Sequence, residues 1–299
     1  MEKLFLKQNL QNSKSKNSPY LAIQLLYTLV AFDFFREVMP SMAYIFYHPN
    51  IEFIFPNILS FLSFFDARWI TTILMISSFP VYILAAVKYQ SQFYRILVFI
   101  HFLVARGLMF SYVRYSHLYF PIFWVMMCLC VCPHFSSPVG KKYFQKTYYA
   151  CLFSLALFYF YPGVWKIILG WQKGLLSHID SGSSTIAYYL LTHGKLSFLG
   201  DFFIFNSEIA YFSFAVVVAF QLSALFAVFY PPYQRLWAVF SLIFHVTTIF
   251  IVSVNFFMIG VVVFIFFYFS PLANSRNDWL YRLTFRLLPA RFKKLTDTT

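Results

Sequence analysis

The sequence predicts an all-α protein, a bundle of about eight transmembrane helices with both termini cytoplasmic. Three observations support this prediction. The chain of 299 residues is 61% hydrophobic and only 11% charged, whereas soluble domains carry about 25% charged residues. Apolar runs long enough to cross about 30 Å of hydrocarbon recur along the chain. The basic residues also collect on one side of those runs, as they do in membrane proteins.

Apolar runs divide the chain into a polar cytoplasmic tail over 1–19, a transmembrane domain over 20–270 and a basic cytoplasmic tail over 271–299. The segment 167–207 is the longest outer loop, and its polarity is too high for a full span. Because it keeps aromatic and leucine residues, we expect it to hold an interfacial or re-entrant element. The eight expected spans lie near 20–47, 70–87, 95–112, 118–132, 147–166, 208–230, 236–252 and 254–270.

The distribution of Lys and Arg gives the orientation. With the N-terminus inside, the bias towards the cytoplasm supports eight spans. It also explains the net charge of +13 without a nucleic-acid partner. The tail from Trp279 to Lys294 alternates apolar and basic residues, which predicts an amphipathic helix on an anionic cytoplasmic leaflet. Of the 23 basic residues, Arg68, Arg114, Lys173 and Lys195 fall outside, Arg36, Arg106 and Lys166 fall within or at the ends of spans, and the rest fall inside.

The four cysteines lie in or beside apolar segments, so the sequence implies no structural disulfide. Helical spacing puts Cys128 and Cys132 on one face, an arrangement that suits either a metal ion or, as the favoured interpretation, simple helix packing. The sequence contains no paired-histidine metal motif, no glycine-rich phosphate loop and no nucleophile elbow. We therefore expect no metal centre.

Ionisable residues inside spans need a reason, because they are costly in hydrocarbon. In the first span Asp33, Arg36 and Glu37 stand at helical spacing, so Asp33 and Arg36 can pair on one face. The favoured interpretation is a structural ion pair between helices. In the third span His101 is expected to make an interhelical hydrogen bond.

Lys166 is the most informative residue, because it follows the long aromatic run that ends at Trp165. A lysine at the edge of hydrocarbon either extends its amine to water or loses part of its charge, and an uncharged lysine acts as a base. The two interpretations are a snorkelling anchor, which Trp165 and Trp171 also suit, and a catalytic base.

Two further sets of polar groups are candidates. His245 lies in the seventh span among apolar neighbours, where a neutral imidazole donates or accepts a proton, or else bonds a neighbouring helix. The outer segment from Arg114 to Tyr119 collects a cation, a hydroxyl, an imidazole and two phenols, a composition that also suits interfacial anchoring. With the expected topology, this segment and Lys166 lie on the same side of the membrane.

The segment from Tyr161 to Gly174, Tyr-Pro-Gly-Val-Trp-Lys-Ile-Ile-Leu-Gly-Trp-Gln-Lys-Gly, resembles the membrane domain of vitamin K-dependent gamma-carboxylases. It is also similar to the wider bacterial group of horizontally transferred transmembrane (HTTM) proteins. A second match is Phe244-His245, followed by an aromatic run to Ser270-Pro271. A third, weaker match is Ser116-His-Leu-Tyr119, although the carboxylases have Asn-His where this chain has Arg114-Tyr115.

The resemblance implies a quinol-dependent enzyme, of the carbon-carbon lyase or monooxygenase type, at the outer face of a bacterial inner membrane. Lys166 would be the base that deprotonates a reduced quinone of the vitamin K or menaquinone type, and His245 would orient the quinol or the base. The substrate would be a peptide or a small molecule. The residues implied to bind the cofactor are Arg114, Ser116, His117, Tyr119 and Trp171.

Two other functions remain open. Some bacterial members of this group mature secreted peptide toxins together with a small partner protein, which suits a chain without the large lumenal region of the eukaryotic carboxylase. A non-enzymatic carrier or assembly factor is the alternative from another class. A carrier is expected to show repeated halves with broken helices, and the sequence shows no such repeat.

Overall fold

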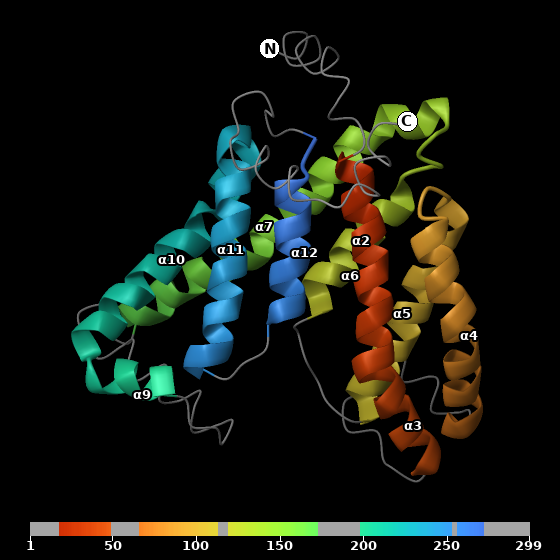
Figure 1. Ribbon diagram of the computed structural model, residues 1–299, viewed down its shortest axis with the longest axis horizontal. Coiled ribbons are helices and arrows are strands. Elements are labelled where there is room, and N and C mark those ends of the chain that lie inside the picture. The colour runs from red at the N-terminus through yellow and green to blue at the C-terminus, as the bar shows by residue number, and fades with distance from the viewer. Residues whose placement is uncertain (1–17, 49–65, 113–118, 173–197, 253–255, 272–299) are drawn as a thin grey trace, which may run out of the picture. The chain divides into compact units, whose positions relative to one another are not determined.

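The computed structural model describes residues 18–48, 66–112, 119–172, 198–252 and 256–271. Every regular element within these ranges is a helix, and they contain no strand (Figure 1). The expected all-α class is therefore confirmed for the described part of the chain. Most of the N-terminal tail and nearly all of the C-terminal tail, including the expected amphipathic helix, lie outside it.

Five helices are long and apolar enough to cross a membrane, so the chain is a multi-pass membrane protein. Each falls on one of the expected spans. The five are α4 (Ala67–Val87), α5 (Gln92–Tyr112), α7 (Pro138–Gln172), α10 (Ser207–Phe229) and α11 (Pro231–Val252).

The other expected spans fall on shorter helical segments. The fourth and eighth coincide with the apolar helices α6 (Phe120–Val131) and α12 (Phe257–Tyr268). The first coincides with three consecutive segments, α2 (Ser18–Asp33), the π-helical η2 (Phe34–Val38) and α3 (Met39–Tyr47). The span count of eight and the cytoplasmic termini stay predictions.

Local sequence explains where several helices begin. The Asp66 carboxylate accepts a hydrogen bond of 2.8 Å from the backbone N–H of Arg68 and so caps α4. Pro121 stands in the first turn of α6 and Pro231 is the first residue of α11. Proline is favoured there because it lacks a backbone N–H, and the N–H groups in the first turn of a helix have no hydrogen-bond partner within the helix.

Helix α7 is longer than the expected span at 147–166. It begins at Pro138, and its first turns are amphipathic, with Lys141 and Lys142 exposed and Phe144 buried. The helix also continues past Lys166, since Pro162 lies inside it without ending it. The expected outer loop at 167–207 is therefore helical at both ends, where α7 finishes and where α9 (Phe198–Phe205) lies.

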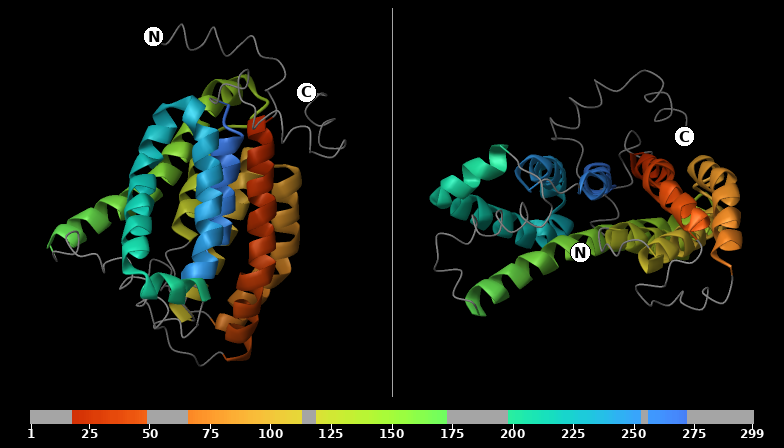
Figure 2. Two further views of the ribbon diagram at one scale, coloured as in Figure 1. Left: turned by 60° about the vertical axis from the view of Figure 1, so that its left-hand side comes forward. Right: turned by 90° about the horizontal axis from the view of Figure 1, so that it is seen from below.

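The chain forms two compact units. The N-terminal unit, residues 20–151, packs α4 against α3 and α5, and α5 against α6. The C-terminal unit begins at residue 152 and packs α11 against α9, α10 and α12. Figure 2 shows α10, α11 and α12 side by side within that unit. Helix α7 supplies residues to both units.

Candidate functional site

Lys166 is half-buried and bonded to a neutral partner. Its Nζ donates a hydrogen bond of 2.8 Å to Oε1 of Gln221 on α10, and it lies 5.9 Å from the centroid of the Phe214 ring. None of the ion pairs found among the described residues includes it. The amine is therefore held by an amide and a ring face, neither of which supplies a countercharge.

Gly163 allows α7 and α10 to approach closely beside this lysine. A Cβ built on Gly163 would lie 3.1 Å from the Cβ of Gln221 and 3.3 Å from the side chain of Leu222. Gly163 and Lys166 are three residues apart and so share a face of the helix. Gln221 is therefore fixed where the two helices meet, and its amide is directed at Lys166.

The same face of α7 carries Tyr159, seven residues before Lys166 and about 10 Å away along the helix axis. Its hydroxyl is hydrogen-bonded to Nε2 of His245 and lies 2.9 Å from Oγ of Ser241, both on α11. Its ring meets Phe220 of α10 edge-on, with the ring centroids 6.0 Å apart. Tyr159 thus joins α7 to both α10 and α11.

The His245 imidazole is held between aromatic rings and a glycine. The ring is 5.1 Å from Phe244, 5.6 Å from Tyr159 and 6.0 Å from Phe256, measured between centroids. A Cβ on Gly260 of α12 would lie 2.7 Å from the His245 ring, so only glycine permits this packing. The residue is 5% exposed. Its Nδ1 atom has no hydrogen-bond partner within the described residues.

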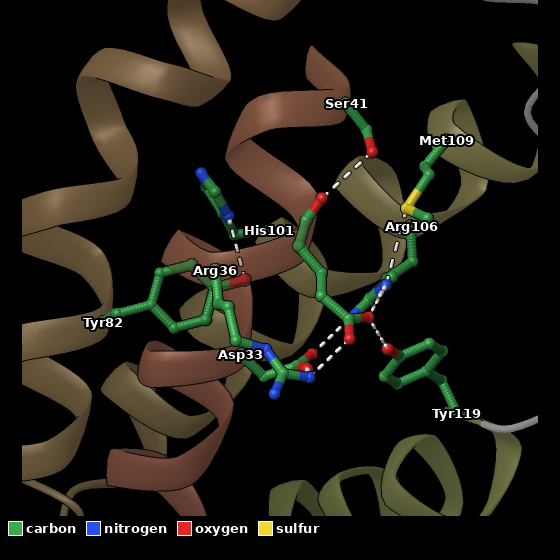
Figure 3. Close-up of polar contacts among 9 residues, drawn as sticks. Asp33, Arg36, Ser41, Tyr82, His101, Arg106, Met109 and Tyr119 are labelled. Carbon is green, nitrogen blue, oxygen red and sulfur yellow. Dashed lines mark hydrogen bonds and ion pairs between the residues drawn. The ribbon is translucent and has the colours of Figure 1, made fainter. Parts of the chain in front are cut away.

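The N-terminal unit holds a separate cluster of charges, shown in Figure 3. Asp33, at the end of α2, is 1% exposed, and Arg106 of α5 is 3% exposed. The two form an ion pair and a hydrogen bond through Arg106 Nη2 and Asp33 Oδ2. This pair between helices matches the structural interpretation of the sequence, although the partner is Arg106. Arg36 is a more distant partner, 3.9 Å from Asp33 Oδ1.

Glu37 and Tyr119 complete this cluster. Glu37 accepts hydrogen bonds from the Tyr119 hydroxyl and from Arg36, and its Oε2 lies 4.0 Å from Nη1 of Arg106. The Arg106 guanidinium also stacks 3.4 Å from the centroid of the Tyr119 ring. Two carboxylates and two guanidinium groups therefore balance in charge, with Asp33 and Arg106 as the buried pair.

A π-helical turn lies beside these carboxylates. The backbone N–H of Met39 bonds to the carbonyl of Phe34, five residues earlier, and so the segment 34–38 is wider than an α-helix. Glu37 lies within this turn and Asp33 precedes it directly. Such turns occur often at functional sites, but here the side chains mainly bind one another.

His101 of α5 makes the interhelical contacts expected of it. Its Nε2 lies 3.0 Å from the carbonyl of Leu74 and 3.2 Å from Oγ of Ser77, both on α4. Its Nδ1 is 3.4 Å from the hydroxyl of Tyr82, also on α4. Both ring nitrogens thus have partners, which explains why this buried histidine is accommodated.

The structure places the two candidate catalytic residues, Lys166 and His245, in the C-terminal unit and Tyr119 in the N-terminal unit. Arg114, Ser116 and His117 lie outside the described residues. Trp171 belongs to the last turn of α7, but its side chain is outside the described part as well. Within the described residues, no three His, Cys, Asp or Glu side chains gather as a metal site.

Sequence reasoning missed Tyr159 and Gln221, which contact the candidate catalytic residues directly. It also missed Ser241, which contacts Tyr159. Gln221 carried a usable signal, because a buried amide in an apolar helix is costly unless it is bonded. Comparison of the chain with protein-family models, with curated proteins and with solved structures finds no match.

Proposed function

We propose that the protein is an integral-membrane enzyme of the carboxylase-like class. It takes a reduced quinone from the bilayer and uses Lys166 as a base to modify a peptide or small substrate at the outer face of a bacterial inner membrane. The proposal includes eight spans with both termini in the cytoplasm. When bound, the reduced quinone supplies the reaction with oxygen that generates a base stronger than any side chain.

One observation carries this proposal: Lys166 and Tyr159, which holds His245, lie on one face of α7 within a single compact unit. The C-terminal unit therefore places the Lys166 amine against Gln221 of α10 and the Tyr159 ring, whose hydroxyl bonds His245, against the neighbouring Phe220. A snorkelling anchor needs no buried amide partner.

The residues present suit a reduced quinone, a flat aromatic ring with two hydroxyl groups. Lys166 would accept a proton from one hydroxyl, because its amide partner supplies no countercharge that stabilises the ammonium form. His245 keeps a buried ring nitrogen without a partner among the described residues, and this nitrogen would bind a hydroxyl. The rings of Phe244 and Phe256 beside it offer apolar faces against which a quinone ring would pack.

The test is oxygen consumption by purified protein with a water-soluble menaquinol analogue. Lys166→Ala removes the amine, whereas Lys166→Arg keeps the positive charge but cannot lose its proton at neutral pH. Lys142→Ala is the matched control, because Lys142 is an exposed lysine of the same helix. Circular dichroism of each variant establishes that it is folded.

We expect wild type and Lys142→Ala to consume oxygen equally. Loss of a catalytic base lowers the rate by about a hundredfold or more, and we expect this of both Lys166 variants. If Lys166→Arg is as active as wild type, Lys166 is an anchor. If the folded wild type consumes no oxygen with the quinol, the quinol chemistry is wrong, and toxin maturation or transport becomes the leading function.

A further inference from the structure

Three buried side chains of the C-terminal unit form a hydrogen-bonded chain. The Tyr159 hydroxyl contacts Oγ of Ser241 on one side and Nε2 of His245 on the other. All three residues are buried, so each hydrogen they carry needs an acceptor within the protein. The chain therefore restricts where the hydrogens lie.

A neutral imidazole allows three arrangements in which both hydrogen bonds are made. One of them, with His245 and Ser241 both donating to Tyr159, leaves the buried Tyr159 hydrogen without an acceptor among the described residues, and so two remain. In the first, His245 donates from Nε2 to Tyr159, Tyr159 donates to Ser241, and Nδ1 carries no hydrogen. In the second, Ser241 donates to Tyr159, Tyr159 donates to Nε2, and Nδ1 carries the hydrogen. Each arrangement uses two of the three available hydrogens and leaves one over.

The two arrangements differ in which hydrogen is left over. In the first it belongs to the Ser241 hydroxyl, which rotates and can bond to a carbonyl of its own helix. Ser77 and Ser223 do this in the same protein, with oxygen–oxygen distances of 2.6 and 2.7 Å. In the second it is the Nδ1–H, whose direction is fixed by the ring and which meets no acceptor within the described residues.

A buried donor without an acceptor costs free energy, and buried N–H groups without partners are rarer than acceptors without partners. We infer that Tyr159 and Ser241 are positioning residues, which hold His245 in the form that carries its hydrogen on Nε2 and leaves Nδ1 as a bare acceptor. Gly260 and the aromatic neighbours fix the plane of the ring, and so they fix the direction of the Nδ1 lone pair.

A bare Nδ1 selects ligands that donate a hydrogen. It binds a hydroxyl group of the phenol or hydroquinone class and does not bind the carbonyl of the oxidised form, which has no hydrogen to give. This selectivity for a hydroxyl ligand rests on the proposed function. It adds to that function a preference for the reduced ligand over its oxidised product.

The test is solid-state nitrogen NMR of the full-length protein in lipid bilayers, with ¹⁵N-labelled histidine. The chain has seven histidines, so a His245→Asn variant identifies the His245 signals by difference. We expect wild type to show Nε2 protonated and Nδ1 unprotonated. In Ser241→Ala the Tyr159 hydroxyl loses its acceptor and turns to Nε2, so the hydrogen moves to Nδ1. In Tyr159→Phe the ring packing stays, and both forms of His245 appear.

A wild-type spectrum with Nδ1 protonated would overturn the inference, and so would a Ser241→Ala spectrum identical to wild type. The signals of the other histidines establish that each variant is folded. If Ser241→Ala does not fold, the wild-type spectrum alone decides. The preference of Nδ1 for a hydroxyl ligand is tested by adding 1,4-naphthohydroquinone without oxygen. This compound is expected to shift the Nδ1 signal, whereas 1,4-naphthoquinone leaves it in place. If neither compound shifts the signal of an unprotonated Nδ1, Nδ1 does not bind this class of ligand, although the imidazole hydrogen still lies on Nε2.

Discussion

The buried ion pair between Asp33 and Arg106 gives a sharp prediction about stability. The perturbation is a set of three variants: Asp33→Leu, Arg106→Met, and the two together. Each single variant leaves one charge buried without its main partner, whereas the double variant removes both charges and fills the space with apolar groups. We expect each single variant to be unstable and the double variant to recover most of the loss.

The contacts give the magnitudes. Breaking a buried pair by removing one partner costs about 3–5 kcal/mol of unfolding free energy. Asp33→Leu lies at the lower end, because Arg106 keeps the Tyr119 ring at 3.4 Å and Glu37 at 4.0 Å. Arg106→Met lies at the upper end, because Asp33 then has only Arg36 at 3.9 Å, and the Arg36 side chain is 41% exposed. Replacing a buried pair by apolar residues is often neutral, so we expect the double variant to lie within about 2 kcal/mol of wild type.

The assay is unfolding of the purified protein in mixed detergent micelles, followed by circular dichroism. The matched control is Arg36→Met, which removes an exposed partner and is expected to cost less than about 1 kcal/mol. The coupling energy follows from the four proteins of the cycle. If the losses of the two single variants simply add in the double variant, Asp33 and Arg106 are not energetically coupled, and the interhelical pair does not stabilise the fold.

Three further predictions concern packing beside the site and in the N-terminal unit. Gly260→Ala places a methyl group 2.7 Å from the His245 ring, so the ¹⁵N signals of His245 should move although its chemistry is unchanged; unmoved signals would contradict the packing. Gly163→Ala crowds Gln221 at 3.1 Å and should lower quinol-dependent oxygen uptake less than Lys166→Ala does, which kinetics of both variants would check. Arg95→Lys removes a buried guanidinium group that donates to five backbone carbonyls. Thermal unfolding should therefore show that the free energy of unfolding falls by about 3 kcal/mol, and an unchanged midpoint would refute this prediction.

The sequence located the five helices that are long and apolar enough to cross a membrane, because hydropathy and helix length are local properties. It also anticipated that Asp33 and Arg36 would share a face, since this follows from their spacing. It did not identify Arg106 as the main partner of Asp33, because that pair joins residues 73 positions apart and depends on how α5 packs. Helix α7 is longer than the expected span at 147–166. The sequence placed the exposed lysines at its start in a cytoplasmic connection, but they form the polar face of a helix.

The sequence indicated the ionisable residues of the candidate site but not the residues that contact them. Lys166 and His245 stand out because ionisable groups are rare in spans. Tyr159 does not, since the chain has 22 tyrosines and nothing in the local sequence marks the one that bonds a histidine. Ser241 is likewise an ordinary helix residue until α7 packs against α11. The residues that contact the candidate catalytic groups therefore come from packing, which single-sequence patterns do not contain.

The most direct test of the account is whether Lys166 and His245 act as one site. The measurement is quinol-dependent oxygen uptake by wild type, Lys166→Ala, His245→Ala and the double variant. Residues that act as a unit are strongly non-additive, so we expect the double variant to be no slower than the slower single variant. If the two effects multiply in the double variant, the residues act independently. If neither substitution lowers the uptake, the proposed site is contradicted.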